Sequence, residues 1–331
     1  MAPQTRYYDL NTYFRKTFGE RVHKLSVDAG LTCPNRDGTL STGGCIYCNA
    51  RGSGTGAHEQ GLSITEQLTR NKKIVGRRFK AKRFLAYFQS FSNTYAPLAT
   101  LRALYDEALA AADMVGLAIG TRPDCVDEAV LALLAEYART HLVWVEYGLQ
   151  SAHDVTLARI QRGHDVKCFM RAVQATRNRG IKICAHVILG LPGETRRHML
   201  ETARRVAGLG IDGIKLHLLY VIRDTPLEAI YRQGGYRCLT QDAYVELVCD
   251  VLELLPPGMV IQRLTGDPHR AELVAPQWSL RKSETLERIR AALVQRDTWQ
   301  GKHFDKSEII SGQNASPGDN GGLRQKPWGS P

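Results

Sequence analysis

The sequence predicts an α/β protein built on a partial (βα)6, TIM-like barrel with a C-terminal α/β extension. Three observations lead to this prediction. Short apolar segments of strand length alternate with longer segments whose apolar residues recur at helical spacing. The apolar segments end in polar or glycine-rich residues, which suits ligand binding at the carboxyl ends of parallel strands. The 331 residues are enough for one barrel-type domain with extensions.

Six strands are expected, each from an apolar run bounded by polar or turn residues. The first lies around Val22 to Val27, ahead of the first cysteines. The second, 83–89, reads Arg-Phe-Leu-Ala-Tyr-Phe-Gln and has the composition of a buried strand. Six such units make about three-quarters of an eightfold barrel. The remaining four strands are expected at 114–119, 142–148, 183–190 and 214–221.

Helices are expected between the strands, where apolar residues recur at helical spacing. Two of the expected helices, 166–180 and 195–209, each end near a glycine. We predict these glycines, Gly180 and Gly210, to be helix C-caps. The alternation of strand and helix predicts βαβ units and therefore a parallel sheet. The four expected helices are 97–112, 126–139, 166–180 and 195–209.

The chain is divided into a core domain at 1–240, an extension at 241–300 that packs on the barrel, and a tail at 301–331. The tail is rich in Ser, Gly, Asn, Asp and Pro, lacks apolar periodicity, and is predicted to be disordered. Within the extension we expect a helix at 242–255, a short strand at 259–264 and a helix at 282–296.

Charge and hydropathy limit the class of protein. The 44 Lys and Arg residues exceed the 33 Asp and Glu residues, which gives a formal charge of +11 and favours polyanionic partners such as nucleic acid. The sequence shows no signal peptide and no long apolar run of membrane-spanning length, so we expect a cytoplasmic protein without a membrane segment.

The basic residues concentrate between Arg70 and Arg83, a segment without any acidic residue. Such a segment is either a solvated helix face ahead of a strand or a phosphate-contacting patch interleaved with Phe79 and Phe84.

Cys33, Cys45 and Cys48 are the most informative residues of the chain. Three thiolates on one loop can hold three irons of a [4Fe–4S] cluster and leave the fourth iron open for a ligand. S-adenosylmethionine (SAM) suits that iron, because its amino and carboxylate groups chelate it while the cluster delivers an electron to the sulfonium. Two other interpretations remain open: a zinc ribbon, for which His58 completes no familiar pattern, and a redox-active pair formed by Cys45 and Cys48.

The other five cysteines are scattered singly, mostly within apolar segments, and are predicted to be small core residues. In a cytoplasmic chain, eight cysteines argue for metal or cluster chemistry rather than for a disulfide framework. These five are Cys125, Cys168, Cys184, Cys238 and Cys249.

Candidate SAM ligands follow the expected strands. Gln150 and Ser151 come directly after one strand and could contact the ribose or carboxylate, although Ser151 could equally cap a helix. Gly190 and Gly193 belong to a turn in which glycines allow close approach of backbone amides to a ligand, or serve only the turn itself. Tyr47 lies between two of the cysteines, where an aromatic ring can pack on adenine or on the protein.

Arg122 follows an expected strand, whereas Arg162 and His164 are expected in a polar loop between helices past the fourth strand. Arg122 could bind a carboxylate or phosphate, or form a salt bridge with Asp124 or Glu146. Arg162 and His164 could reach the substrate or lie on the surface.

Taken together, the motifs resemble the radical SAM superfamily and, more closely, the bacterial YtqA/YhcC-like radical SAM proteins. Eleven residues separate Cys33 from Cys45, more than the common CxxxCxxC spacing, but this family and the related radical subunit of Elongator share the longer spacing. The resemblance covers about residues 5–300. It rests on seven segments in order: 22–38, Gly43-Gly-Cys-Ile-Tyr-Cys48, Tyr87-Phe-Gln89, Gly120-Thr-Arg-Pro-Asp124, Gly148-Leu-Gln-Ser151, Arg162-Gly-His164 and Gly190-Leu-Pro-Gly-Glu194.

The resemblance implies a [4Fe–4S] cluster bound by the three cysteines, SAM, and formation of a 5′-deoxyadenosyl radical. It implies that Tyr47 packs on SAM, that Gln89, Gln150, Ser151 and the Gly190 turn surround it, and that the substrate is a modified wobble uridine of tRNA, such as one carrying a carboxymethylaminomethyl group. A flavodoxin or ferredoxin is the expected electron donor.

Two other functions remain open from the sequence. The enzyme could act on a small molecule such as a porphyrin precursor, or the chain could be a metal-stabilised RNA-binding or regulatory protein without turnover. Oligomeric state cannot be deduced from the sequence.

Overall fold

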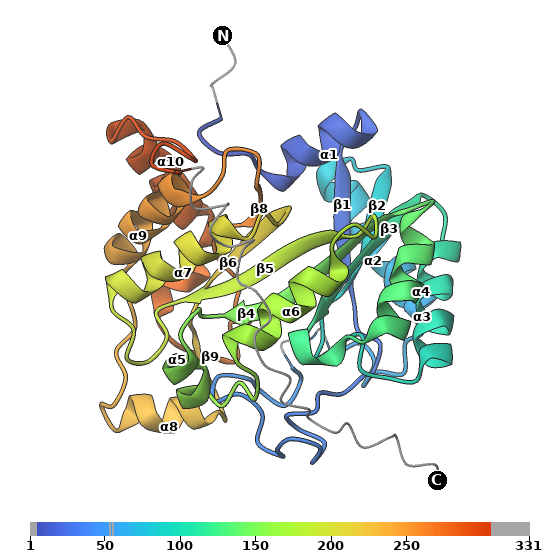
Figure 1. Ribbon diagram of the computed structural model, residues 1–331, viewed down its shortest axis with the longest axis horizontal. Coiled ribbons are helices and arrows are strands. Elements are labelled where there is room, and N and C mark those ends of the chain that lie inside the picture. The colour runs from blue at the N-terminus through green and yellow to red at the C-terminus, as the bar shows by residue number, and fades with distance from the viewer. Residues whose placement is uncertain (1–4, 53, 55, 306–331) are drawn as a thin grey trace.

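A seven-stranded parallel sheet forms the centre of the computed structural model, which describes residues 5–52, 54 and 56–305. The strands follow one another in chain order across the sheet, and the sheet curls into an incomplete barrel (Figure 1). The strands are β1 (Val22–Val27), β2 (Arg83–Phe88), β3 (Met114–Thr121), β4 (Leu142–Gln150), β5 (Lys182–Leu189), β6 (Gly213–Leu218) and β8 (Val260–Arg263).

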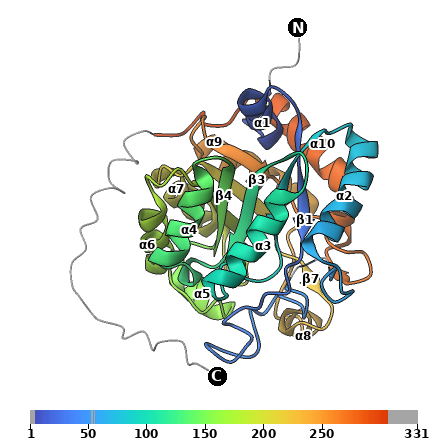
Figure 2. The same cartoon turned by 90° about the vertical axis from the view of Figure 1, so that its right-hand side faces the viewer.

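Helices α2, α3, α4, α6 and α7 cover the outer face of the sheet, and α9 packs between α7 and α10 (Figures 1 and 2). None of the described helices is long and apolar enough to cross a membrane. The helices are α1 (Leu10–Phe18), α2 (Ile64–Phe79), α3 (Leu98–Ala110), α4 (Glu128–Ala138), α5 (Asp154–Arg159), α6 (Val166–Thr176), α7 (Arg196–Gly208), α8 (Pro226–Arg232), α9 (Gln241–Leu254) and α10 (Lys282–Gln295).

Two short 3-10 helices and a small second sheet complete the described elements. The 3-10 helices are Pro123–Cys125 and Gln277–Leu280. The second sheet pairs β7 (Val221–Ile222) with β9 (Leu273–Ala275) in antiparallel fashion.

The predicted α/β class and partial barrel are confirmed, with one addition. The short strand of the extension, β8, pairs in parallel with β6 and becomes the seventh strand of the sheet. The expected strand 214–221 is too long, because β6 ends at Leu218 and β7 forms separately. The extension therefore supplies part of the barrel wall.

The prediction that Gly180 and Gly210 end helices is confirmed for only one of the two. Gly180 is not a C-cap: α6 ends at Thr176 because Arg177 leaves the helical conformation and Asn178 adopts a φ of 62°. Gly210 does follow the C-cap of α7, with a φ of 61°.

The predicted disorder is wrong for 301–305, where the amides of Gly301 and His303 donate to the carbonyls of Leu252 and Glu253 at 3.0 and 2.9 Å. Phe304 packs on the core, which explains this order. The remaining part of the predicted tail, from 306 on, lies outside the described residues.

Side-chain alternation divides the barrel strands into two faces. In β4, Val143, Val145 and Tyr147 belong to the large apolar core under the outer helices. Trp144 belongs instead to a smaller apolar cluster, to which α1 contributes Phe14. One position further along the same face, Glu146 is fully buried. The inner face is thus apolar at the amino ends of the strands and charged in the middle.

Candidate active site

A cavity of about 850 Å³ lies inside the barrel and opens toward the carboxyl ends of the strands. The loop between β1 and α2 supplies part of its lining, including Asn35, Gly44 and Gly52. All three cysteines of this loop line the cavity: Cys33, Cys45 and Cys48. Parallel α/β proteins bind their ligands at this end of the sheet, because strand ends and loop backbone converge there.

Glycine and asparagine shape the cysteine loop. Gly44 has a φ of 73°, a conformation that L side chains rarely adopt, and its amide donates to the carbonyl of Asn35 at 2.7 Å. A Cβ at this position would lie 2.9 Å from the Arg36 guanidinium. The Asn35 amide nitrogen donates to the Gln161 carbonyl at 2.6 Å and lies 3.7 Å from the Cys45 sulfur. These contacts place Cys45 against the loop that follows α5.

Positive charge surrounds the cysteines. Arg162 Nη1 lies 3.7 Å from the Cys45 sulfur. Arg36 Nη2 donates to the carbonyls of Cys48 and Asn49 at 2.6 and 2.7 Å. Burial, with Cys45 as its neighbour, raises the pKa of the Cys48 thiol to about 11. Because iron takes the thiolate, ligation at Cys48 would release a proton, and the two guanidiniums would stabilise the resulting negative charge.

The cysteine geometry fits an iron–sulfur cluster better than a zinc ion. Within the described ranges, no three His, Cys, Asp or Glu side chains are grouped closely enough to bind a single metal ion. A tetrahedral zinc site needs such convergence, whereas a [4Fe–4S] cubane takes each thiolate on a different iron. Three thiols that face one cavity without meeting at a point therefore fit the cluster.

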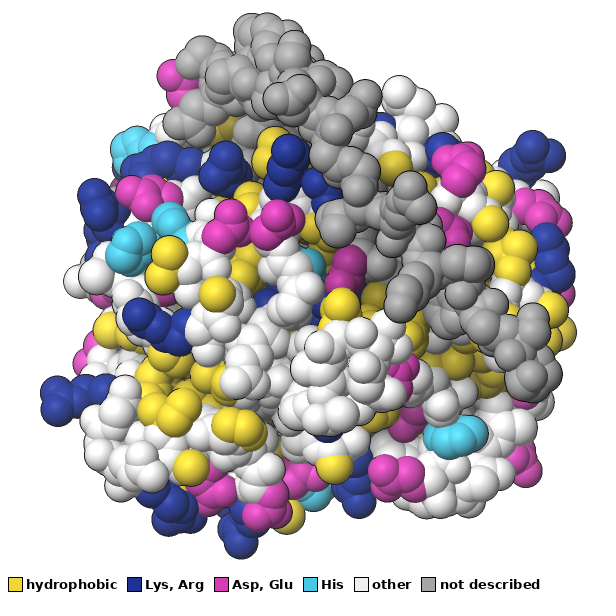
Figure 3. Space-filling view, turned by 60° about the horizontal axis from the view of Figure 1, so that its bottom comes forward, with side chains coloured by type: hydrophobic (Ala, Val, Ile, Leu, Met, Phe, Trp, Pro, Cys, Tyr) yellow, Lys and Arg dark blue, Asp and Glu magenta, His cyan; other side chains and the backbone are white. Residues whose placement is uncertain are grey.

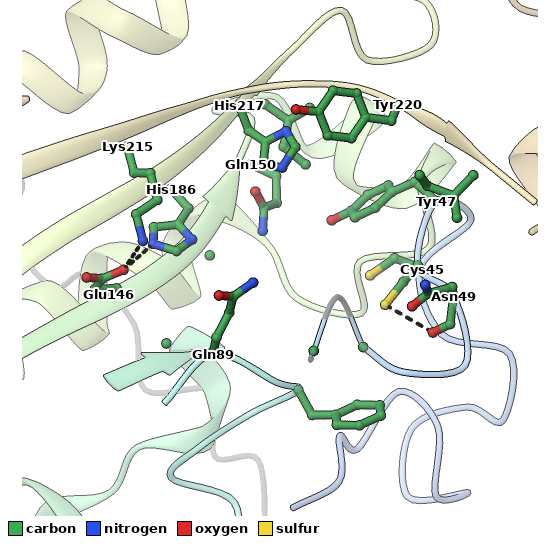
Figure 4. Close-up of a pocket in the computed structure, with 18 of the residues that line it drawn as sticks. Cys45, Tyr47, Asn49, Gln89, Glu146, Gln150, His186, Lys215, His217 and Tyr220 are labelled. Atoms are coloured by element: carbon green, nitrogen blue, oxygen red, sulfur yellow. Dashed lines mark hydrogen bonds and ion pairs between the residues drawn. The ribbon is translucent and has the colours of Figure 1, made fainter. Parts of the chain in front are cut away.

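Two glutamines and a tyrosine from the predicted site also line the cavity: Tyr47, Gln89 and Gln150. Figure 4 shows Cys45 and Tyr47 on one side of the cavity, with Gln89 and Gln150 projecting into it from the barrel strands. Gln150 has a φ of 73° at an irregularity of the β4–β5 pairing. Ser26 donates to the Gln89 side-chain oxygen at 3.1 Å, which orients its amide.

The other three predicted SAM contacts lie behind the cavity wall. Ser151 is fully buried, donates to the Glu194 carboxylate, and is not the N-cap of α5, which is His153. Gly190 accepts a hydrogen bond from the Tyr236 hydroxyl at 2.7 Å. A Cβ on Gly193 would lie 1.5 Å from the Arg159 side chain. None of the three is among the residues that line the cavity.

The structure distinguishes between the two uses considered for Arg122 and for Arg162. Arg122 forms a two-pronged salt bridge with Asp124, at 2.8 and 2.6 Å, and donates to the Arg162 carbonyl at 2.7 Å. Arg122 thus forms the predicted salt bridge with Asp124 and also lines the cavity. Arg162 is buried beside Cys45 and donates to the Gly148 carbonyl at 2.9 Å. His164 lies 3.2 Å from the same carbonyl.

The sequence analysis missed a charged layer in the middle of the barrel. Its centre is Glu146 of β4, which accepts hydrogen bonds from Lys24 of β1, Lys215 of β6 and His186 of β5, the last at 2.8 Å. Figure 4 shows Lys215 and His186 beside Glu146. Lys215 also contacts the Tyr87 hydroxyl at 3.0 Å. The available signal was a charged residue at an inward position of an otherwise apolar strand, as in Val-Trp-Val-Glu146-Tyr.

Burial and neighbouring charges control the protonation of this layer. Burial alone would raise the pKa of Glu146, but Lys215 and Lys24 hold it well below its ordinary value of 4.5. Burial, reinforced by Lys215, lowers the pKa of His186 to about 3. Burial also lowers the pKa of both lysines, and Glu146 opposes that shift. At neutral pH the layer therefore holds an ionised carboxylate and a neutral imidazole.

The remaining cysteines do not line the cavity. Cys125, Cys184 and Cys249 are buried, and Cys168 and Cys238 are half-buried. All are free thiols. The prediction of core residues is therefore confirmed for Cys125, Cys184 and Cys249 and is wrong in part for Cys168 and Cys238.

Known proteins resemble this chain throughout its length. The family model of the Radical SAM superfamily matches residues 37–206, and that of the Radical_SAM C-terminal domain matches residues 211–295. The chain is 43% identical over 305 residues to the uncharacterized protein YtqA of Bacillus subtilis, covering 92% of this chain and 95% of YtqA. Over 156 residues it is 31% identical to tRNA uridine(34) acetyltransferase of Dehalococcoides mccartyi, 46% of this chain and 33% of that protein.

A solved structure shows the same fold. The archaeal Elp3 of Methanocaldococcus infernus, with its N-terminus deleted, superposes with a TM-score of 0.65 at 15% identity, covering 84% of this chain and 64% of Elp3. Three observations therefore indicate the same family: the two family models, the similarity to YtqA over nearly the whole chain, and the cavity lined by the three cysteines. The chain belongs to the radical SAM superfamily, whose members use a [4Fe–4S] cluster and S-adenosylmethionine.

Proposed function

We propose that this protein is a radical SAM enzyme that modifies the C5 substituent of a wobble uridine in tRNA. The observation that carries the proposal is one continuous cavity, with the three cysteines at its mouth and a polar, charged interior beneath them. When bound, the cluster and SAM supply a 5′-deoxyadenosyl radical that takes a hydrogen atom from the substrate. The chain's own residues hold both cofactors, exclude water and position the substrate.

The cofactor ligands are proposed residue by residue. Cys33, Cys45 and Cys48 bind the cluster, and Tyr47 packs on SAM. Gln89 and Gln150 donate hydrogen bonds to SAM from the barrel rim, because their amides project into the cavity. Ser151, Gly190 and Gly193 act indirectly: the Ser151–Glu194 hydrogen bond connects the end of β4 to the turn after β5. The extension at 241–300 completes the barrel wall through β8.

Similarity and charge support tRNA as the substrate. The match to a protein named for tRNA uridine(34) covers 46% of this chain, and the formal charge of +11 favours a polyanion. Exposed arginines on segments beside the mouth offer phosphate contacts: Arg159, Arg223 and Arg270. Figure 3 shows Lys and Arg side chains spread around the edge of this face rather than in one patch.

The basic segment on α2 is a weaker candidate for RNA contact. α2 begins beside the carboxyl end of β1 and ends just before β2, so its basic C-terminal half lies toward the amino ends of the strands. Phe84 is buried and lies under Lys72, whose ammonium group is 5.4 Å from the ring centroid. Arg83 forms a salt bridge with Glu20 at 3.0 Å. We therefore propose that RNA approaches the cavity mouth.

The test combines two products in one assay. The protein is reconstituted anaerobically with iron and sulfide and reduced by dithionite or by a flavodoxin- or ferredoxin-type donor. It is then given SAM together with tRNA isolated from cells that lack this protein. We expect 5′-deoxyadenosine and a changed mass of the wobble nucleoside. Formation of 5′-deoxyadenosine without any change in the tRNA would retain the radical chemistry and reject the substrate. Binding of tRNA that does not weaken with salt would also contradict the proposal.

A further inference from the structure

The charged layer in the barrel has no part in the cofactor binding that we propose for the cysteine loop and the glutamines. It lies on the opposite side of the cavity from Cys45 and Tyr47 (Figure 4). Its charged members come from the middle of their strands, so they lie below the rim formed by Gln89 and Gln150. The side chains are well shielded: Glu146 is 0% exposed and Lys215 is 5% exposed. We call this layer, with Arg263, the barrel floor; its members are Lys24, Tyr87, Glu146, His186, Lys215, Gln262 and Arg263, all of which line the cavity.

The barrel floor carries more positive than negative charge. Lys24 and Lys215 share a single carboxylate, that of Glu146. Arg263 donates to the Leu216 carbonyl at 3.5 Å and forms no salt bridge within the described part of the chain. His186 adds no charge, because it is neutral at neutral pH. Even if one lysine gave up its proton, the guanidinium would leave an excess of positive charge.

The other charged groups around the cavity have nearer partners. Asp267 pairs with Lys282 at 3.1 Å, and Glu272 accepts from Asn49 at 2.9 Å. Arg36 and Arg162 belong to the cysteine loop and its neighbour. No further carboxylate lines the cavity among the described residues. A buried excess of cationic charge is costly unless a bound anion offsets it, so the barrel floor is suited to an anionic group.

We propose that the barrel floor binds a carboxylate carried by the substrate, with Lys215, Lys24 and Arg263 as its specificity-determining residues. The identification of the group rests on charge and shape; its attachment to uridine rests on the proposed function. A backbone phosphodiester is bonded to two riboses, so it cannot extend into the barrel as a terminal group. A pendant carboxylate on a base substituent can reach past the rim, and its oxygens match the ammonium and guanidinium donors.

The test compares two nucleosides that differ only in this charge. Binding of 5-carboxymethyluridine and of its neutral carboxamide, 5-carbamoylmethyluridine, is measured by calorimetry on the reconstituted protein with SAM present. We expect the carboxylate to bind roughly ten- to hundredfold more tightly, the range for a charge-assisted hydrogen bond. Equal affinities, or no saturable binding of the carboxylate, would overturn the inference.

Variants assign the preference to the barrel floor. Lys215→Met leaves Glu146 bonded to Lys24 and His186, and we expect it to reduce the ratio of the two affinities about tenfold. Arg263→Gln, which breaks no described salt bridge, serves where the first variant folds poorly, and Arg263→Lys should restore the ratio in part. Arg197→Gln on exposed α7 is the matched control, at 77% side-chain exposure. A purely structural effect would weaken the binding of both nucleosides equally and leave the ratio of their affinities unchanged.

This experiment fails independently of the proposed function. The preference for the carboxylate could disappear in Lys215→Met while the tRNA stays unchanged in the activity assay. This result would support carboxylate binding by the barrel floor and reject tRNA as the substrate. Modified tRNA together with equal nucleoside affinities would do the opposite.

Discussion

The cysteine loop and the barrel floor line the same cavity but are assembled in different ways. The three cysteines lie within sixteen residues of one another in sequence, from Cys33 to Cys48. The charged residues of the barrel floor come one at a time from four strands, between Lys24 and Arg263, and His186 comes from a fifth. The loop has its chemistry encoded locally, whereas the floor depends on the whole barrel. Damage to the first should therefore affect cofactor binding alone, and damage to the second should affect the fold as well.

The largest effect is expected from Cys45→Ala. Loss of one thiolate should remove bound iron and reduce 5′-deoxyadenosine formation to background, because the cluster needs all three ligands. The barrel should remain folded, since Cys45 belongs to the loop outside the sheet. Iron content, product formation and circular dichroism check these outcomes. Cys168→Ala is the control, because Cys168 is also a free thiol but lies outside the cavity.

Glu146→Gln should produce the opposite pattern. It leaves two buried ammonium groups without their carboxylate, and we expect a loss of about 3 kcal/mol in the free energy of unfolding, typical of a broken buried ion pair. Cysteine ligation should persist. Urea denaturation measures the loss. The matched control is Glu136→Gln, whose exposed pair with Arg102 at 2.7 Å should contribute at most about 1 kcal/mol. Equal losses in both variants would refute the energetic distinction between floor and surface.

Acid should destabilise the floor in a defined pH range. The pKa of His186 is about 3 in the folded protein and 6.5 when exposed, so the unfolded chain binds the additional proton between these values. Stability should therefore fall as pH drops from about 6.5 toward 3, by up to about 1.4 kcal/mol per pH unit for this one group.

Glu146 adds to the acid sensitivity at still lower pH. Because its folded pKa is depressed, its contribution is present above 4.5 and is lost as pH falls through the lower folded value. His186→Asn should flatten the stability profile between pH 6 and 4, as measured by thermal melting. An unchanged slope would show that this histidine is not buried as a neutral group.

The smallest effects distinguish the rim of the cavity from its wall. Gln150→Ala should raise the KM for SAM several-fold and leave stability nearly unchanged, because its amide projects into the cavity. Ser151→Ala removes the hydrogen bond to Glu194 and should lower stability by about 1 kcal/mol with little effect on KM. Steady-state kinetics and denaturation of both variants measure the contrast. A larger change in KM for Ser151→Ala would place this serine in direct contact with SAM.

The sequence by itself determined the α/β barrel and the cysteine loop. Strand and helix periodicity are local properties, and most predicted strands end within two residues of the observed ones. The spacing of Cys33, Cys45 and Cys48 is local too, so it indicated a cluster before any fold was known. Gln89 and Gln150 could be identified as candidate residues from the sequence for the same reason, because each lies at the end of a recognisable strand.

Only the tertiary structure decided how separate strands combine. Whether Arg122 and Ser151 face a ligand or the protein depends on Asp124 and Glu194, and in the second case the partner is distant in sequence. The seventh strand depends on β8 reaching β6 across α9. The barrel floor requires the curl of the sheet, because only closure brings Lys24 and Lys215 to one carboxylate on β4. A charged residue within an apolar strand indicates an inward position, but its partners are fixed by the geometry of the barrel.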